Sequence, residues 1–180
     1  MNTPTILLLP GWQNSGPGHW QTAWERLHGD QRVEQHDWAR PLRGDWSARL
    51  EEVVADIPGP EVLAAHSLGC ILTAWWAAHT RHAHKVRGAL LVAPGDVERP
   101  ALAPQLAGWA PIARQRLPFP AVLVGSRDDP YCSLERAQAL ASDWGARFVD
   151  AGARGHINAE SGLGAWPEGR ALLESLTDKD

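Results

Sequence analysis

Short apolar runs recur along the chain and alternate with amphipathic stretches. Most of the runs are unbroken, which is typical of strands buried on both faces of a parallel sheet. The runs that predict strands are Thr5–Leu9, Val33–His36, Val62–Ala65, Gly88–Val92, Ala121–Gly125 and Arg147–Val149. Apolar residues at helical spacing predict helices over His19–Leu27, Trp46–Ile57, Leu68–Thr80, Ser133–Trp144 and Glu168–Leu176.

Strands that alternate with helices indicate parallel neighbours joined by right-handed crossovers. We therefore expect a three-layer α/β/α sandwich around a sheet of about six parallel strands. A chain of 180 residues is the size of one domain, so residues 1–180 are predicted to form a single unit. The irregular, proline-rich stretch Pro94–Pro120 is expected to hold a helix near Gln105–Arg116 and to be the one segment long enough to cover part of a site.

Charge and composition argue against several kinds of partner. Seventeen basic and 21 acidic residues leave a net charge of −4, so we expect no nucleic acid, whose binding requires a cationic face. No apolar run approaches the ~20 residues that span a bilayer, and no charged leader precedes Ile6–Leu9, so we expect no membrane anchor or signal peptide. Two cysteines, Cys70 and Cys132, fit a reducing cytoplasm as the expected location.

The sharpest local motif surrounds Ser67. The apolar run Val62–Ala65 leads into His66-Ser67-Leu68-Gly69, and a helical pattern follows. This order matches a nucleophile elbow, with Ala65 where a glycine is usual. Such a turn holds the serine in strained backbone angles above the end of the strand, and the helix start supplies the free N–H of Leu68. The alternative is an ordinary strand–helix turn in which Ser67 caps the helix.

A serine hydroxyl needs a base to take its proton, and one known chain order for such sites is serine, acid, histidine. Both later groups follow predicted strands: Asp128-Asp129-Pro130 comes after Ala121–Gly125, and His156 lies in a glycine-flanked loop after Val149. Proline restricts the residue before it to extended geometry, so we favour Asp129 as the acid. Asp128 remains the alternative; it could instead accept backbone N–H bonds within its own loop.

The loop after the first strand begins Pro10-Gly11-Trp12, and its sharp turn predicts the Trp12 N–H as a second oxyanion donor beside that of Leu68. A phosphate-binding loop is not indicated, because no Gly-Lys-Ser/Thr follows. The histidines at positions 79, 82 and 84 lie close together but do not supply a closed ligand set. We therefore expect neither a metal nor a cofactor.

Together these motifs resemble the α/β-hydrolase superfamily, and within it the small lidless serine hydrolases of the YdeN and retinoblastoma-binding protein nine type. The resemblance covers nearly the whole chain and departs from the usual pattern at Ala65. It is carried by Leu9-Pro10-Gly11, Gly18-His19-Trp20 with Trp24, His66-Ser67-Leu68-Gly69, Asp128-Asp129-Pro130 and Gly155-His156-Ile157-Asn158. It implies a minimal α/β-hydrolase fold with the strand order 2-1-3-4-5-6. It also implies Ser67 as nucleophile, Asp129 as acid and His156 as base, and hydrolysis without a defined substrate.

The expected function is cleavage of a small acyl ester through an acyl-enzyme. An amidase, aminopeptidase or thioesterase on the same triad is the first alternative, and a catalytically weak protein-binding module is the second. No feature indicates a protein partner, and the oligomeric state stays open. Ten tryptophans are unusual for this length, and we expect an apolar acyl pocket from those near the predicted catalytic end, namely Trp12, Trp20, Trp38 and Trp109.

Overall fold

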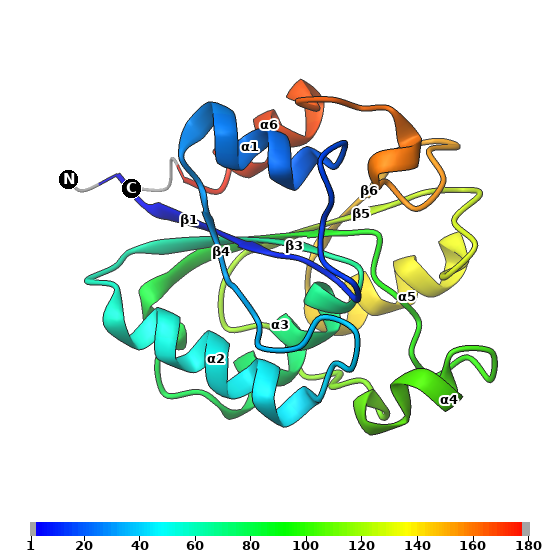
Figure 1. The fold of residues 1–180 in the computed structure, drawn as a ribbon, viewed down its shortest axis with the longest axis horizontal. Helices are drawn as coiled ribbons and strands as arrows, with labels where there is room; N and C mark the ends of the chain where they lie inside the picture. The colour runs from blue at the N-terminus through cyan, green and yellow to red at the C-terminus, as the bar shows by residue number, and fades with distance from the viewer. Residues whose placement is uncertain (1–2, 178–180) are drawn as a thin grey trace.

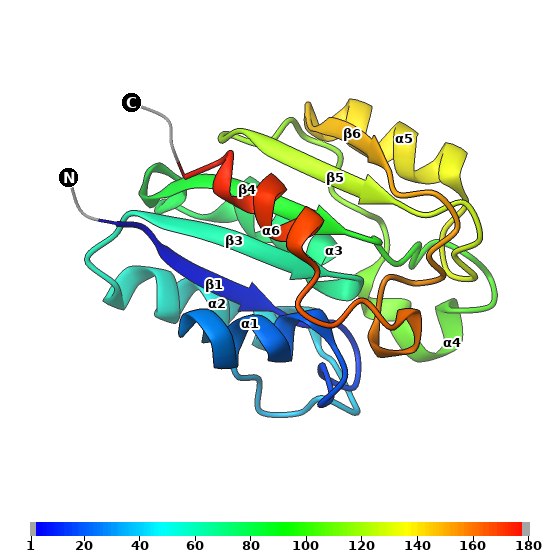
Figure 2. The same cartoon turned by 90° about the horizontal axis from the view of Figure 1, so that it is seen from above.

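The computed structural model describes residues 3–177, which fold around a six-stranded, all-parallel sheet. The strand order is β2-β1-β3-β4-β5-β6, as predicted (Figure 2). The strands are β1 (Thr5–Leu9), β2 (Gln31–Arg32), β3 (Glu61–His66), β4 (Val86–Val92), β5 (Ala121–Gly125) and β6 (Arg147–Asp150). Every residue of β3 and β5 is buried, which explains why apolar runs without alternation marked the central strands.

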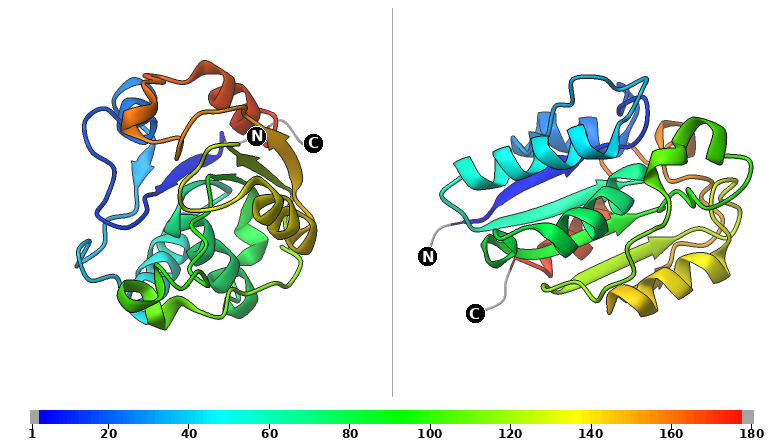
Figure 3. Two further views of the ribbon diagram at one scale, coloured as in Figure 1. Left: turned by 90° about the vertical axis from the view of Figure 1, so that its right-hand side faces the viewer. Right: turned by 90° about the horizontal axis from the view of Figure 1, so that it is seen from below.

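Helices cover both faces of the sheet and complete the three predicted layers (Figures 1 and 3). The helices are α1 (Trp20–His28), α2 (Arg43–Asp56), α3 (Leu68–His79), α4 (Ala103–Leu106), α5 (Leu134–Trp144) and α6 (Pro167–Glu174). Helices α1 and α6 lie on one face, where Trp20, Trp24 and Leu173 join one apolar cluster. Helices α2, α3 and α5 lie on the other, around the larger cluster that includes Leu50, Ile71 and Leu140.

The second strand is not where the apolar pattern predicted it. Instead of Val33–His36, the edge strand is Gln31–Arg32, which pairs with Leu7 and Leu8 of β1. The ladder ends when the Val33 N–H donates to the Leu8 carbonyl at 2.9 Å. The apolar pattern missed this strand because both of its residues are polar. Arg32 is stabilised there by a 2.9 Å ion pair between its guanidinium and Glu25 of α1.

The stretch Pro94–Pro120 also differs from prediction. Its helix is not near Gln105–Arg116 but is the single turn α4, followed by a 3₁₀ turn over Ala107–Trp109. The helical path stops at Ala110, which is extended and precedes Pro111, since a proline disfavours helical geometry in the residue before it.

Loops at the carboxyl edge of the sheet carry the sequence-predicted site residues. Trp12 follows β1, Ser67 follows β3, Asp129 follows β5 and His156 follows β6. Parallel strands all end at the same edge, so residues separated by up to 144 positions meet there. Within residues 3–177, no helix has the length and apolar character needed to cross a bilayer.

Candidate active site

Ser67 occupies the turn between β3 and α3 in a strained conformation. Its backbone angles are φ 55° and ψ −117°, a region that a residue with a Cβ rarely adopts and that costs on the order of 1–3 kcal/mol. The Ser67 side chain makes no capping hydrogen bond to the helix, unlike Ser133, whose Oγ accepts from the Arg136 N–H in α5. The capping alternative for Ser67 is therefore wrong.

Three glycines leave room for this turn. A Cβ on Gly69 would lie 2.2 Å from the Leu9 carbonyl oxygen, so the start of α3 can approach β1 only without a side chain there. A Cβ on Gly11 would lie 2.9 Å from that of Ser67, and one on Gly95 would lie 3.3 Å from the Ser67 Oγ. The methyl group of Ala65, by contrast, is fully buried and accommodated in the core.

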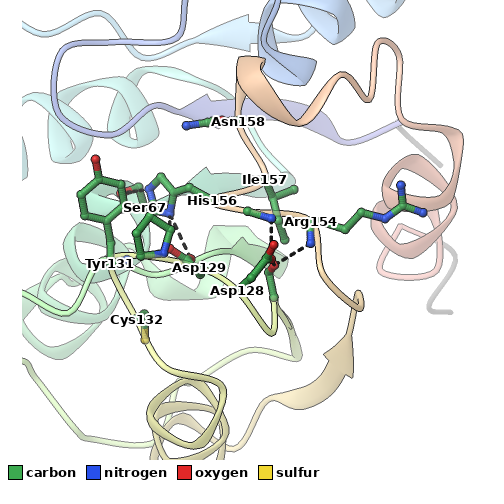
Figure 4. Close-up of polar contacts among 12 residues, drawn as sticks. Ser67, Asp128, Asp129, Tyr131, Cys132, Arg154, His156, Ile157 and Asn158 are labelled. Atoms are coloured by element: carbon green, nitrogen blue, oxygen red, sulfur yellow. Dashed lines mark hydrogen bonds and ion pairs between the residues drawn. The ribbon is translucent and has the colours of Figure 1, made fainter.

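His156 connects the serine to a carboxylate (Figure 4). Its Nε2 lies 2.9 Å from the Ser67 Oγ, and its Nδ1 lies 2.9 Å and 3.0 Å from the two carboxylate oxygens of Asp129. Only 10 % of the His156 side chain and 2 % of the Asp129 side chain are exposed, so little water competes for these bonds. The arrangement has the geometry of a nucleophile, a base and an orienting acid.

Asp128 points away from Ser67 and contacts the loop that carries His156 (Figure 4). Its Oδ1 accepts from the Gly155 N–H at 2.8 Å and from the Ser126 hydroxyl at 3.0 Å, and these bonds, the Gly155 amide first, lower the pKa of the Asp128 carboxyl. Ser126 in turn accepts from the Arg154 N–H at 2.9 Å. Of the two adjacent aspartates, the structure therefore brings Asp129 to His156 and leaves Asp128 to the loop backbone.

Two backbone donors face the space beside Ser67. Trp12 and Leu68 both line the cavity that contains Ser67, and Leu68 begins α3. Throughout the described chain, neither of their N–H groups finds a hydrogen-bond acceptor. Free amides at the start of a helix and in a tight turn can stabilise a developing oxyanion.

The cavity above Ser67 has a volume of about 360 Å³ and a mixed wall. Val97, Leu102 and Leu106 of the Pro94–Pro120 stretch provide apolar surface, so this stretch does cover part of the site. Polar groups come from the remaining wall, chiefly Gln13, Asn14, Tyr131 and Asn158. Sequence reasoning missed the three aliphatic residues, because the stretch that contains them follows no regular period.

Of the four tryptophans expected in this wall, only Trp12 lines the cavity. Trp20, the first residue of α1, is buried and donates from Nε1 to the Ile157 carbonyl at 3.0 Å. Trp38 packs edge-on against Trp46, and Trp109 is buried and donates to the Pro41 carbonyl at 3.0 Å. For Trp20 and Trp109 the expectation was wrong because a buried indole N–H needs an acceptor, and each finds one in a backbone carbonyl. Trp38 packs on Trp46 instead.

Ion pairs fasten the covering stretch to the body of the protein. The Glu98 carboxylate pairs with Arg114 at 3.0 Å and with Arg136 of α5, and it also accepts the Ile112 N–H at 2.9 Å. Arg136 in addition forms a 3.3 Å pair with Asp96. The two pairs with Arg136 thus tie the stretch that carries the aliphatic wall to α5.

Two buried histidines that the sequence motifs left without a role stand beside the site. His19 and His66 line the cavity but are only 4 % and 6 % exposed. Burial, followed by the positive Arg32 and by His156, lowers the pKa of His19 to about 3. Burial, followed by His19 and His156, also places the pKa of His66 well below its ordinary value of 6.5. Both rings are therefore neutral at physiological pH.

These histidines should make the protein acid-sensitive. Their folded-state pKa values lie below 6.5, so the unfolded chain binds more protons, and stability falls as the pH drops from about 6.5 toward 3. Replacing His19 with asparagine, which still caps a helix, should reduce the loss of unfolding free energy between pH 7 and pH 5 by about 2 kcal/mol. Urea denaturation at both pH values measures it. A His19→Asn variant that loses as much free energy between the two pH values as the unaltered protein would contradict the assignment.

Comparisons with known proteins identify the family of the chain. Residues 6–175 match the serine hydrolase family. A YdeN-like hydrolase from Pectobacterium atrosepticum is 30 % identical, with a TM-score of 0.86 over 97 % of this chain and 90 % of that one. The ydeN gene product of Bacillus subtilis is 21 % identical, with a TM-score of 0.79 over 98 % of this chain and 100 % of that one. No curated protein sequence matches significantly. The chain accordingly belongs to the serine hydrolase family, as a small α/β-hydrolase of the YdeN type.

Proposed function

We propose that this hydrolase is an esterase that cleaves small, uncharged acyl esters through Ser67, His156 and Asp129. The observation that carries the proposal is the continuous hydrogen-bonded path from the Ser67 Oγ through His156 to Asp129, at the floor of a partly apolar cavity. A serine hydroxyl in that path is activated without a metal ion, because the imidazole takes its proton.

The reaction follows from the positions of these groups. His156 Nε2 takes the Ser67 proton as the Ser67 oxygen attacks the ester carbonyl carbon, and the N–H groups of Trp12 and Leu68 bind the resulting oxyanion. Asp129 orients His156 and stabilises its imidazolium form without taking the proton. The imidazolium then protonates the leaving alcohol, and an acyl group remains on Ser67. Water, deprotonated by His156, releases the acid and restores the serine.

The cavity wall favours a neutral ester over an aminopeptidase substrate. Among the described residues that line it there is no Asp, Glu, Lys or Arg side chain. A free α-ammonium group held there would lose hydration without gaining a carboxylate partner, which is costly. The aliphatic side chains Val97, Leu102 and Leu106 instead suit the hydrocarbon part of an acyl chain.

A matched pair of substrates tests this proposal. The methyl esters of N-acetylalanine and of alanine differ chiefly in one positive charge, and kcat/KM should be at least ~10-fold higher for the acetylated ester, since an unpaired ammonium group costs more than 1.4 kcal/mol. Hydrolysis is measured by titration of the released acid at a pH where the amine is protonated. Preference for the free amine would favour an aminopeptidase, and no turnover of any ester would contradict the proposed activity.

A further inference from the structure

A chain of hydrogen bonds passes through both buried histidines and ends on the backbone of the proposed base. The Gln21 N–H of α1 donates to the His19 Nδ1 at 3.1 Å. The His19 Nε2 lies 3.3 Å from the His66 Nδ1, and the His66 Nε2 lies 2.8 Å from the carbonyl oxygen of His156. The chain therefore links α1, the end of β3 and the loop after β6.

The two ends of this chain determine where its protons lie. A backbone N–H can only donate, so the His19 Nδ1 must be bare and its Nε2 must carry the proton. That proton faces the His66 Nδ1, which must accept it, and the His66 Nε2–H then donates to the His156 carbonyl. Each ring thus has one tautomer that satisfies both of its contacts, and that tautomer is neutral.

The backbone of the loop is left-handed on both sides of His156, and it is strained at Ile157. Gly155 has a φ of 57° and Ile157 a φ of 47°, the second unfavourable for a β-branched residue. On the near side, Asp128 accepts the Gly155 N–H at 2.8 Å. On the far side, Trp20 donates to the Ile157 carbonyl at 3.0 Å. The hydrogen bond from His66 lies between these two contacts, on the carbonyl of His156. The ring of His156 contacts both Ser67 and Asp129.

We propose that His66, oriented by His19, is a positioning residue that fixes the peptide of His156 and thereby the direction of its imidazole toward Ser67. This inference rests on the proposed role of His156 as the base. The ring of His66 also packs against that of His156, with centroids 4.8 Å apart. His66 thus contacts His156 in two ways, through a hydrogen bond to its carbonyl and through packing of the two rings. Loss of the hydrogen bond alone therefore turns the His156 peptide while the His156 ring stays covered.

Two substitutions at one position separate positioning from packing. His66→Met fills much of the space but has no N–H donor, and it should lower kcat roughly 10- to 100-fold with KM changed less than twofold, because a misplacement near 1 Å has about that cost. His66→Gln retains an N–H for the His156 carbonyl and should restore most of the lost kcat. Steady-state hydrolysis of a p-nitrophenyl ester gives both constants, and the downfield proton signal of the His156–Asp129 bond should shift in the Met variant only.

The matched control is Trp144→Phe, which removes another buried side-chain bond, 2.8 Å from Nε1 to the Ala113 carbonyl, away from the cavity. It should lower the melting temperature and leave kcat unchanged. If His66→Met does not fold, His19→Asn keeps the helix cap but cannot reach His66, and should reduce kcat severalfold. An unchanged kcat in the folded variant, or no recovery in His66→Gln, would overturn the inference. Absence of turnover in the unaltered protein would instead refute the proposed function.

Discussion

Replacing Ser67 with alanine is expected to lower kcat for ester hydrolysis by roughly 10⁵-fold, because the nucleophile is lost while the oxyanion donors remain. The substitution keeps the Cβ and removes only Oγ, so it adds no contact with Gly11 or Gly95 and should not reduce stability. Labelling of the folded protein with a fluorophosphonate probe should disappear with the same change, and also with His156→Ala.

Ser142→Ala is the control for this experiment, since Ser142 is exposed on α5 and should retain full turnover and labelling. The outcome also decides between an enzyme and a protein-binding module on the same fold. A Ser67→Ala variant as active as the unaltered protein would contradict the assigned nucleophile. Failure of the unaltered, folded protein to react with the probe would favour the binding module.

The second large effect is expected at the acid. Asp129→Asn should reduce kcat roughly 10³- to 10⁴-fold, because an amide nitrogen facing His156 favours the tautomer whose Nε2 carries the proton and cannot accept that of Ser67. Asp128→Asn should cost less than ~10-fold, since its amide oxygen can still accept the Gly155 N–H. Both variants lose one negative charge, so the change in overall field is matched. Hydrolysis of the same p-nitrophenyl ester compares them.

The two variants separate orientation of the imidazole from support of the loop, because the two aspartates are adjacent in the chain but have different hydrogen-bond partners. Asp129 receives the His156 Nδ1–H within a largely dry contact, whereas Asp128 is exposed and bonds to loop amides. An equal or larger loss for Asp128→Asn would mean that loop support, rather than orientation of the imidazole, dominates the effect of the acid. Circular dichroism and thermal melting of both variants separate this result from unfolding.

Much of the architecture was predictable because strands that are buried on both faces have continuous apolar sequences. Continuous apolar runs in β3, β4 and β5 reflect coverage on both faces, and the alternation of strands with helices indicates a parallel sheet. The order of the strands came from the resemblance to α/β-hydrolases. The site geometry followed in part from the same logic. Ser67, Asp129 and His156 each come just after a predicted strand, and the carboxyl ends of neighbouring parallel strands converge.

Features that depend on where a side chain turns in space were not predictable. The contact between His19 and His66 joins residues 47 positions apart, and no local pattern shows that their rings meet. Arg32 lies in an edge strand because its side chain finds Glu25, a reason that a count of apolar residues cannot detect. Trp20 and Trp109 were placed near the correct edge, but their indole N–H groups draw them into the core rather than to the cavity.

The ion pairs of Glu98 have a consequence for how substrates are selected. Because Glu98 pairs with Arg136 of α5 and Arg114 pairs with Asp143 of α5, we expect the aliphatic side chains over Ser67 to form a wall of fixed dimensions rather than a flap that folds down on its ligand. For the proposed esterase, we expect a chamber of about 360 Å³ with such a wall to accept acyl groups that fit it and to exclude longer ones. We then expect selectivity to depend on the length of a few aliphatic side chains and not on a domain movement.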